Sequence, residues 1–184
     1  RDPNGQDLAA IVKELGLSDG QVLLSTQKYP PEHLAMVYNI ADCTINVSNA
    51  EGFGLATLES LSCGTPIIAT MTGGLQEQVT NGTDFFGVGL MPTAKSIIGS
   101  QEVPYIYEDR IDKDQFFSAL SKIYNVSAET RRDMGMQGHN HVKTNYNFKD
   151  FERKWVKFMD KVIETKGSWK ARKGYNGIRF KEVA

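Results

Sequence analysis

Two glutamates frame a glycine-rich turn near the middle of the sequence. Glu51 is followed directly by Gly52-Phe53-Gly54, and Glu59 comes eight positions after Glu51. Glycines let a backbone approach a ligand closely, and the first N–H groups of a helix have no partner within that helix. A phosphate or diphosphate is the ligand that such a turn favours. The pattern alone leaves ordinary turn chemistry open as the alternative.

The second acid is harder to explain than the first. On a helical projection that begins at Leu55, Glu59 falls between Leu55 and Cys63, at the margin of the apolar arc. A carboxylate near the core is costly unless it is paired or hydrogen-bonded. We therefore expect Glu59 to accept hydrogen bonds, either from ligand hydroxyls such as those of a ribose or from a neighbouring N–H or lysine. For Glu51 the alternative is a charge that the helix dipole favours.

Short apolar strands and amphipathic helices alternate along the chain, and they must position these acids. The hydrophobic spacing predicts strands over residues 21–25, 43–48, 66–70 and 87–91, and helices over residues 4–16, 30–41, 55–63, 75–80, 113–124, 128–143 and 148–164. This order predicts an α/β fold, a Rossmann-like parallel sheet with crossover helices and extra C-terminal helices. Ligands of such sheets bind at the carboxyl ends of the strands. Gly73 and Gly74 start a helix at the same edge and offer a second set of free N–H groups.

Composition narrows the class of protein. The chain has 184 residues, 40% of them hydrophobic, which predicts a globular domain. Its net charge of −1 produces no overall positive potential that would attract nucleic acid. No apolar run is long enough for a membrane span. Cys43 and Cys63 lie in apolar settings and suggest a reducing compartment such as the cytoplasm. Because the chain begins at Arg1 without an initiator Met, we expect a piece of a longer protein.

Four other features of the sequence bear on its structure. The connection over residues 93–112 is long for a strand–helix loop, so it is expected to be functional or disordered. Residues 166–184 form a basic and aromatic tail, read as a strap or solvated segment, with an interdomain or membrane-surface contact left open. Asp112 and Asp114 are expected to cap a helix. His139 and His141 are two positions apart and would face different ways on a helix, so no metal site is expected.

Residues 41–82, "ADCTINVSNAEGFGLATLESLSCGTPIIATMTGGLQEQVTNG", resemble the donor-binding half of retaining glycosyltransferases of family 4, which have the GT-B fold. The likeness includes the E-x7-E pair, the EGFGL turn, the CGTP strand entry and a GG-x-x-E helix start. The convincing match spans residues 4–92. Several motifs in the right order carry this resemblance, which the E-x7-E pair alone would not.

The resemblance implies roles for particular residues. Glu51 would be the catalytic residue beside the transferred sugar. Its carboxylate would bind a sugar hydroxyl and stabilise positive charge at the anomeric carbon. Glu59 would hold the ribose hydroxyls of a UDP- or GDP-sugar. The remaining donor-binding residues would be Ser48, Asn49, Gly52, Phe53, Gly54, Leu55, Gly73 and Gly74. Such enzymes generally need no metal and no further cofactor.

The chain also departs from the family pattern. Members of the family have an N-terminal acceptor domain and a pair of basic residues that clamps the diphosphate. Neither is found at the matching place in this sequence, and Arg1 and Lys13 are poorly placed to replace the basic pair. We therefore expect residues 1–165 to be a nucleotide-sugar-binding domain that is inactive alone, with the acceptor (a glycan, lipid or small molecule) held elsewhere. The alternatives are half of a sugar-nucleotide epimerase and a non-catalytic module that only binds a nucleotide-sugar or a partner protein.

Overall fold

The computed structural model describes residues 5–168, 170, 171 and 173, and the chain divides into two compact units, residues 1–34 and 35–184. The first unit holds α1 (Leu8–Glu14) and the first turn of α2 (Pro31–Ile40). The Asp7 side chain caps α1 by accepting from the Ala10 N–H at 3.2 Å. Both helices were predicted, although α1 begins later than expected and Asn4 lies outside the described residues.

The predicted strand over residues 21–25 is wrong. These residues form a turn and irregular backbone, and Leu23 is 88% exposed. A strand needs a neighbouring strand for its backbone hydrogen bonds. Residues 5–34 contain no strand with which this apolar run could pair.

The second unit is built on a parallel sheet of three strands. These strands are β1 (Thr44–Asn46), β2 (Ile67–Thr70) and β3 (Gly87–Leu90), with β2 in the centre. Thr44 pairs with Ile67, and Ile67 pairs with Gly87. All three strands were predicted from their apolar runs, and the carboxyl ends of all three lie at one edge of the sheet, as expected for parallel strands.

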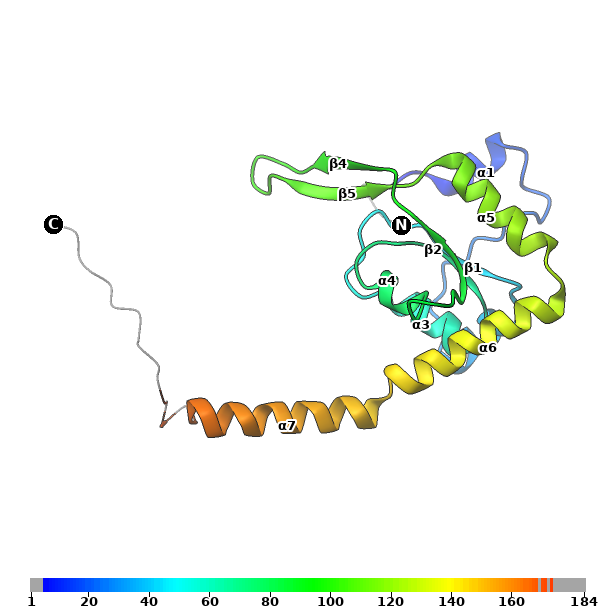
Figure 1. Ribbon diagram of the computed structural model, residues 1–184. Coiled ribbons are helices and arrows are strands. Elements are labelled where there is room, and N and C mark those ends of the chain that lie inside the picture. Colours follow the sequence, from blue (N-terminus) through cyan, green and yellow to red (C-terminus); the bar gives the residue numbers. More distant parts are fainter. Residues whose placement is uncertain (1–4, 169, 172, 174–184) are drawn as a thin grey trace. The chain divides into compact units, whose positions relative to one another are not determined.

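The two faces of the sheet carry separate hydrophobic clusters, because alternate residues of β2 point to opposite faces. Ile67 and Ala69 pack with Leu61 of α3 (Leu55–Ser62) and with Leu75 of α4 (Leu75–Gln78). Ile68 packs on the other face with residues of α5 (Lys113–Asn125). The sheet therefore lies between α3 and α4 on one side and α5 on the other, which is the expected α/β arrangement (Figure 1).

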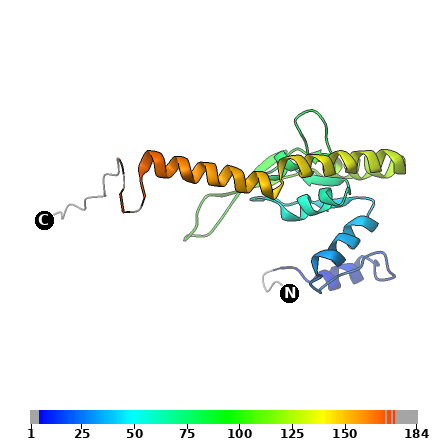
Figure 2. The same ribbon diagram turned by 90° about the horizontal axis from the view of Figure 1, so that it is seen from below.

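Helix α6 (Ala128–Asn145) packs closely against α3 (Figures 1 and 2). Gly135 and Gly138 make this approach possible, since a Cβ on Gly135 would lie 1.8 Å from the carbonyl oxygen of Gly64 and one on Gly138 would lie 2.6 Å from a methyl of Leu61. The His139 ring nitrogen Nδ1 donates to the Ser62 carbonyl at 2.7 Å. Helix α6 thus packs against the C-terminal end of α3 at a distance that larger residues at positions 135 and 138 would prevent.

The long connection after β3 is an antiparallel hairpin, which the sequence analysis did not predict. Strand β4 (Ala94–Ile98) pairs with β5 (Ile106–Arg110), with Lys95 opposite Asp109. The Asp109 N–H donates to the carbonyl of Asn49 at 2.7 Å. This bond ties the hairpin to the segment that leads into Glu51, so the connection is ordered at its base rather than disordered.

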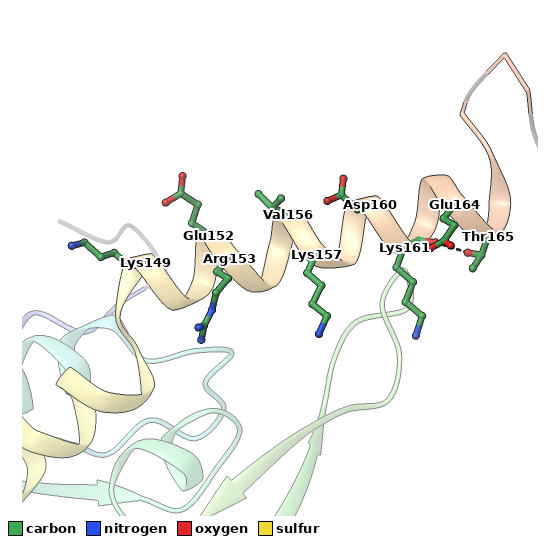
Figure 3. A pocket seen from close by; sticks show the side chains of 9 residues that line it. All are labelled: Lys149, Glu152, Arg153, Val156, Lys157, Asp160, Lys161, Glu164 and Thr165. Carbon is green, nitrogen blue, oxygen red and sulfur yellow. Dashed lines mark hydrogen bonds between the residues drawn. The ribbon is translucent and has the colours of Figure 1, made fainter.

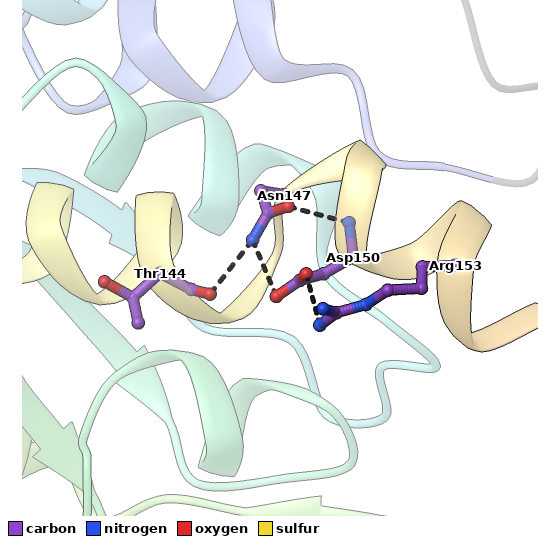
Figure 4. A network of polar contacts seen from close by, with 4 residues as sticks. All are labelled: Thr144, Asn147, Asp150 and Arg153. Carbon is purple, nitrogen blue, oxygen red and sulfur yellow. Dashed lines mark hydrogen bonds and ion pairs between the residues drawn. The ribbon is translucent and has the colours of Figure 1, made fainter.

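Helix α7 (Phe148–Lys166) begins with a defined cap (Figure 4). The Asn147 side chain accepts from the Asp150 N–H at 2.8 Å and donates to the Thr144 carbonyl at 3.1 Å, and Arg153 pairs with the Asp150 carboxylate at 2.7 Å. Across the described residues, every helix is too short or too polar to cross a membrane. The tail predicted over residues 166–184 lies mainly outside the residues that the structure describes.

A groove along α7 is lined by charges of both signs. Lys157 and Lys161 point to one side of the helix, and Glu152 and Asp160 point to the other (Figure 3). Because all of its lining residues come from one helix, no set of side chains converges on a ligand there. The groove is a solvated helix face, and the chemistry predicted from the sequence lies elsewhere. Its lining residues are Lys149, Glu152, Arg153, Val156, Lys157, Asp160, Lys161, Glu164 and Thr165.

Candidate anion-binding site at the carboxyl edge of the sheet

The turn over residues 51–54 packs against the turn over residues 73–74, which follows β2. A Cβ on Gly73 would lie 1.7 Å from the carbonyl oxygen of Glu51, and one on Gly74 would lie 2.8 Å from the carbonyl oxygens of both Gly52 and Phe53. The structure therefore brings together the two glycine-rich segments that the sequence analysis placed at one edge of the sheet. Gly73 also has a φ of +48°, a conformation that glycine adopts without strain.

The packing of these carbonyls decides where the N–H groups of the turn point. In a planar trans peptide, the C=O of one residue and the N–H of the next point in opposite directions. The carbonyls of Glu51, Gly52 and Phe53 face the residue 73–74 turn, so the N–H groups of the three following residues point away from it. None of these N–H groups has a hydrogen-bond partner among the residues that the structure describes. They form an array of free donors.

The array continues into the start of α3. Gly54 is the N-cap residue, with φ +87°, and no side chain satisfies the first N–H groups of the helix. The positive end of the helix dipole is therefore added to the free donors of the turn. A Cβ on Gly54 would lie 2.4 Å from a methyl of Leu75, so only glycine fits at this point of the chain.

Glu59 does not lie at a buried margin of α3, as the helical projection suggested. It is exposed, and Leu55, taken as part of the apolar face, is 67% exposed. The buried residues of the helix are Thr57, Ser60 and Leu61. The projection failed because the hydroxyls of Thr57 and Ser60 form hydrogen bonds inside the protein, with the side chains of Asn46 and Thr44.

The carboxylate of Glu59 has a polar partner within the protein, although this partner is neither the N–H nor the lysine that the sequence suggested. The Tyr38 hydroxyl of α2 donates to Glu59 Oε2 at 3.0 Å. Burial, followed by this hydrogen bond to the carboxylate, raises the pKa of Tyr38 to about 12. Tyr38 was expected to face inward as part of a helical apolar stripe, and this gave no sign of its contact with Glu59. The contact fixes Oε2, whereas Oε1 has no hydrogen-bond partner in the part of the chain that the structure describes.

We expect Tyr38→Phe to lower the free energy of unfolding by about 1 kcal/mol at neutral pH, because a partly exposed hydrogen bond to a carboxylate is lost. Since the folded pKa lies above the unfolded one, the contribution of this group is complete below pH 10 and is lost between pH 10 and about 12. Urea unfolding of both proteins at several pH values measures the difference. A constant difference through pH 12 would contradict the assignment.

Phe53, the aromatic residue of the turn, is supported from α6. Its ring contacts the Tyr146 ring edge to face, with centroids 6.2 Å apart. The Tyr146 hydroxyl and His141 Nε2 both donate to the Glu77 carbonyl at the end of α4, at 3.2 and 3.0 Å. The C-terminal part of α6 thus braces both the turn and α4, a connection that residue types and spacing did not indicate.

Ser48 and Asn49 reach the site through their local structure. The Ser48 hydroxyl donates to Asn46 Oδ1 at 2.7 Å, and the Asn49 carbonyl accepts from Asp109, as described above. Both residues therefore shape the segment between β1 and Glu51. A direct contact of either residue with a ligand stays a prediction.

The other polar features have structural partners. Asp112 caps α5 by accepting from the N–H groups of Asp114 and Gln115, at 2.7 and 3.2 Å, which confirms the predicted cap. His139 and His141 contact different backbone carbonyls, on α3 and α4. In the described part of the chain, histidine, cysteine and acidic residues form no group that could hold a metal ion.

Comparison with known proteins shows what the chain is similar to. Residues 2–141 match the family model described as glycosyl transferases group 1. A D-inositol 3-phosphate glycosyltransferase of Acidothermus cellulolyticus is 38% identical over 82 residues, which cover 45% of this chain and 18% of that protein. Another, of Frankia alni, is 34% identical over 107 residues, which cover 58% of this chain and 23% of that protein. The chain thus spans about a fifth of the length of these relatives.

Solved structures show the same fold. A sucrose-phosphate synthase from Thermosynechococcus elongatus superposes with a TM-score of 0.64 and 24% identity, over 89% of this chain and 37% of that one. The C-terminal domain of a glycosyl transferase group 1 family protein from Francisella tularensis superposes with a TM-score of 0.55 and 22% identity, over 77% and 61% of the two chains. At these identities the likeness concerns the fold.

Proposed function

The chain belongs to the glycosyl transferases group 1 family, and from this premise we propose that it binds the diphosphate of a UDP- or GDP-sugar on the 51–54 turn. The sugar would be transferred with retention of configuration to an acceptor held by an N-terminal domain outside this chain. On this proposal the chain is the donor-binding half of a two-domain enzyme and does not turn over alone.

The free N–H array of residues 52–54 is the observation that carries the proposal. These three N–H groups have no hydrogen-bond partner among the described residues, and they lead into the start of α3, where no described side chain caps the helix. Backbone donors held in this way stabilise negative charge without reorganising. A diphosphate gains most from them as it leaves, because its charge increases when the bond to the sugar breaks. The site therefore supports transferase chemistry without a protein nucleophile.

The two acids take different parts in this proposal. Glu59 would accept hydrogen bonds from ribose hydroxyls with the carboxylate oxygen that Tyr38 leaves open. Glu51 is half-buried at the start of the turn, and its backbone is fixed by the contact of its carbonyl with Gly73. It would bind a hydroxyl of the transferred sugar and stabilise positive charge at the anomeric carbon. No metal is proposed, because the donors of the turn and the helix supply the positive potential.

We expect Glu59→Gln to weaken the binding of UDP or GDP about tenfold, since a charge-assisted hydrogen bond becomes a neutral one. Glu51→Gln should leave nucleotide binding within about twofold of wild type, because Glu51 would contact the sugar and not the nucleotide. Calorimetric titration of the 184-residue chain measures both. The reverse pattern would show that the two roles are exchanged.

The transfer step needs a protein that also holds the acceptor. There Glu51→Gln should slow transfer while the donor still binds. Analysis of the product decides the reaction class, with a glycosylated acceptor of unchanged anomeric configuration expected. Free epimerised sugar would replace the transferase proposal by an epimerase one, and donor binding without any product would favour a binding module.

A further inference from the structure

Gln78, the last residue of α4, is a buried polar residue whose amide is only half satisfied. It is 0% exposed, and its Nε2 donates to the carbonyl of Phe53. Its Oε1 is buried and has no hydrogen-bond partner within the described part of the chain. Buried polar atoms are nearly always paired, so an unpaired one calls for an explanation.

Stability does not explain why a glutamine occupies this position. An unpaired buried acceptor destabilises the folded state, and an apolar side chain of similar length would avoid that loss. The surroundings are suited to an apolar side chain, since Leu75 and Val79 of the adjoining hydrophobic cluster are fully buried. What the glutamine alone adds is the hydrogen bond to the carbonyl of Phe53.

This hydrogen bond sets the orientation of one peptide of the anion site. With the Phe53 carbonyl held toward Gln78, the Gly54 N–H points the opposite way, away from Gln78, although Gly54 as a whole residue is buried. Gln78 Oε1 would also lie 3.1 Å from a Cβ on Gly54, so the same amide lines the space that residue 54 leaves free. Without the donor, the peptide between Phe53 and Gly54 loses the hydrogen bond that holds its carbonyl and keeps only the packing of this carbonyl against Gly74.

Gln78 is itself held in place. The carbonyl of Glu77, the preceding residue, accepts hydrogen bonds from His141 and Tyr146, both from the C-terminal part of α6. Tyr146 also contacts the ring of Phe53. Both the backbone and the ring of Phe53 are therefore supported from α4 and α6, which leaves the turn little freedom to rotate.

We propose that Gln78 is a positioning residue that aims the Gly54 N–H at the diphosphate of the donor. It touches no ligand and acts through the Phe53–Gly54 peptide. The identity of the anion rests on the proposed function, whereas the control of the peptide orientation does not.

Gln78→Met tests the inference, because methionine keeps the length of the side chain and removes the donor. We expect UDP and GDP to bind about tenfold more weakly by calorimetry, the loss of one oriented donor to a charged group. The melting temperature should stay within a few degrees of wild type, since the unpaired Oε1 is removed together with the hydrogen bond. A purely structural role would instead lower the melting temperature without a separate effect on affinity.

Gln76→Met is the matched control. Gln76 lies on the same short helix but is exposed, and among the described residues its Nε2 hydrogen-bonds to the Gly73 carbonyl alone, at 3.4 Å. This variant should bind both nucleotides within about twofold of wild type. Equal affinities for Gln78→Met and Gln76→Met would overturn the inference.

A second measurement separates this inference from the proposed function. In ¹H–¹⁵N NMR spectra without ligand, Gln78→Met should shift and broaden the amide signals of Phe53 and Gly54 while the signals of β2 stay in place. Unchanged signals at both residues would overturn the positioning role whatever the protein binds. Failure of the wild-type chain to bind either nucleotide would overturn the proposed function and the assignment of the anion with it.

Discussion

Gly73→Ala is expected to abolish detectable binding of UDP and GDP and to lower the free energy of unfolding by about 3 kcal/mol or more. A φ of +48° strains any residue with a Cβ, and the Cβ would lie 1.7 Å from the Glu51 carbonyl oxygen. The exposed turn can relieve the clash only by moving away from Gly73, which disperses its N–H groups. Thermal or urea unfolding and calorimetric titration measure the two effects.

Gly82→Ala separates the strain of the backbone from the clash. Gly82 also has a positive φ, +95°, but nothing lies within 4 Å of its added Cβ. This variant should lose about 1–2 kcal/mol from backbone strain alone and keep its affinity for nucleotides. If Gly73→Ala behaved like Gly82→Ala in both measurements, the contact between the 73–74 and 51–54 turns would not support the site.

Gly135→Ala is expected to destabilise the protein by about 2–3 kcal/mol, although alanine is the better helix former. The added methyl would lie 1.8 Å from the carbonyl oxygen of Gly64 and 3.3 Å from Pro66 Cδ, both at the entry to β2. Helix α6 would have to move away from α3. Chemical unfolding gives the free energy, and a lowered melting temperature is the simplest sign of the effect.

Gln137→Ala is the control on the same helix. Gln137 is exposed, so its replacement should change stability by no more than about 0.5 kcal/mol. A Gly135→Ala protein as stable as this control, or more stable, would mean that α6 and α3 do not pack through these glycines.

The parallel sheet and most of its helices could be predicted because their local signals agree with their tertiary positions. Residues 66–70 form an apolar run between turn signals, and β2 is buried on both faces. Gly64 and Gly16 follow predicted helices and have positive φ angles, as helix ends often do. Such elements can be recognised from the residues themselves, without knowledge of their partners.

The elements that were predicted wrongly or not at all share a physical cause. Whether each forms depends on partners that are distant in the sequence. Residues 21–25 are apolar enough for a strand but form none in the described unit. The hairpin β4–β5 mixes charged and apolar residues on both strands, so its pairing of Lys95 with Asp109 appears only with the register. Pattern analysis weighs each segment alone and cannot detect such pairing.

The residues of the candidate site also divide into those that could be recognised from the sequence and those that could not. Glu51, Glu59 and the glycines were found from their spacing, and the structure brings the 51–54 and 73–74 turns together. The supporting residues Tyr38 and Gln78 were missed. Tyr38 belongs to an apolar stripe, which indicates packing and not a polar contact, and a polar residue on a helix as short as α4 is normally read as solvent-facing. Their roles follow from contacts with residues at least 21 positions away in the chain.

The central claim is that the free N–H array of the 51–54 turn binds the diphosphate of a nucleotide. Calorimetric titration of the 184-residue chain with UDP, UMP and uridine, and with the guanosine series, in the presence of a chelator, tests it most directly. The account predicts binding of one molecule of UDP or GDP per chain without added metal, with affinity that falls as phosphates are removed. The absence of binding by any nucleoside diphosphate, or equal affinities for diphosphate and nucleoside, would contradict it.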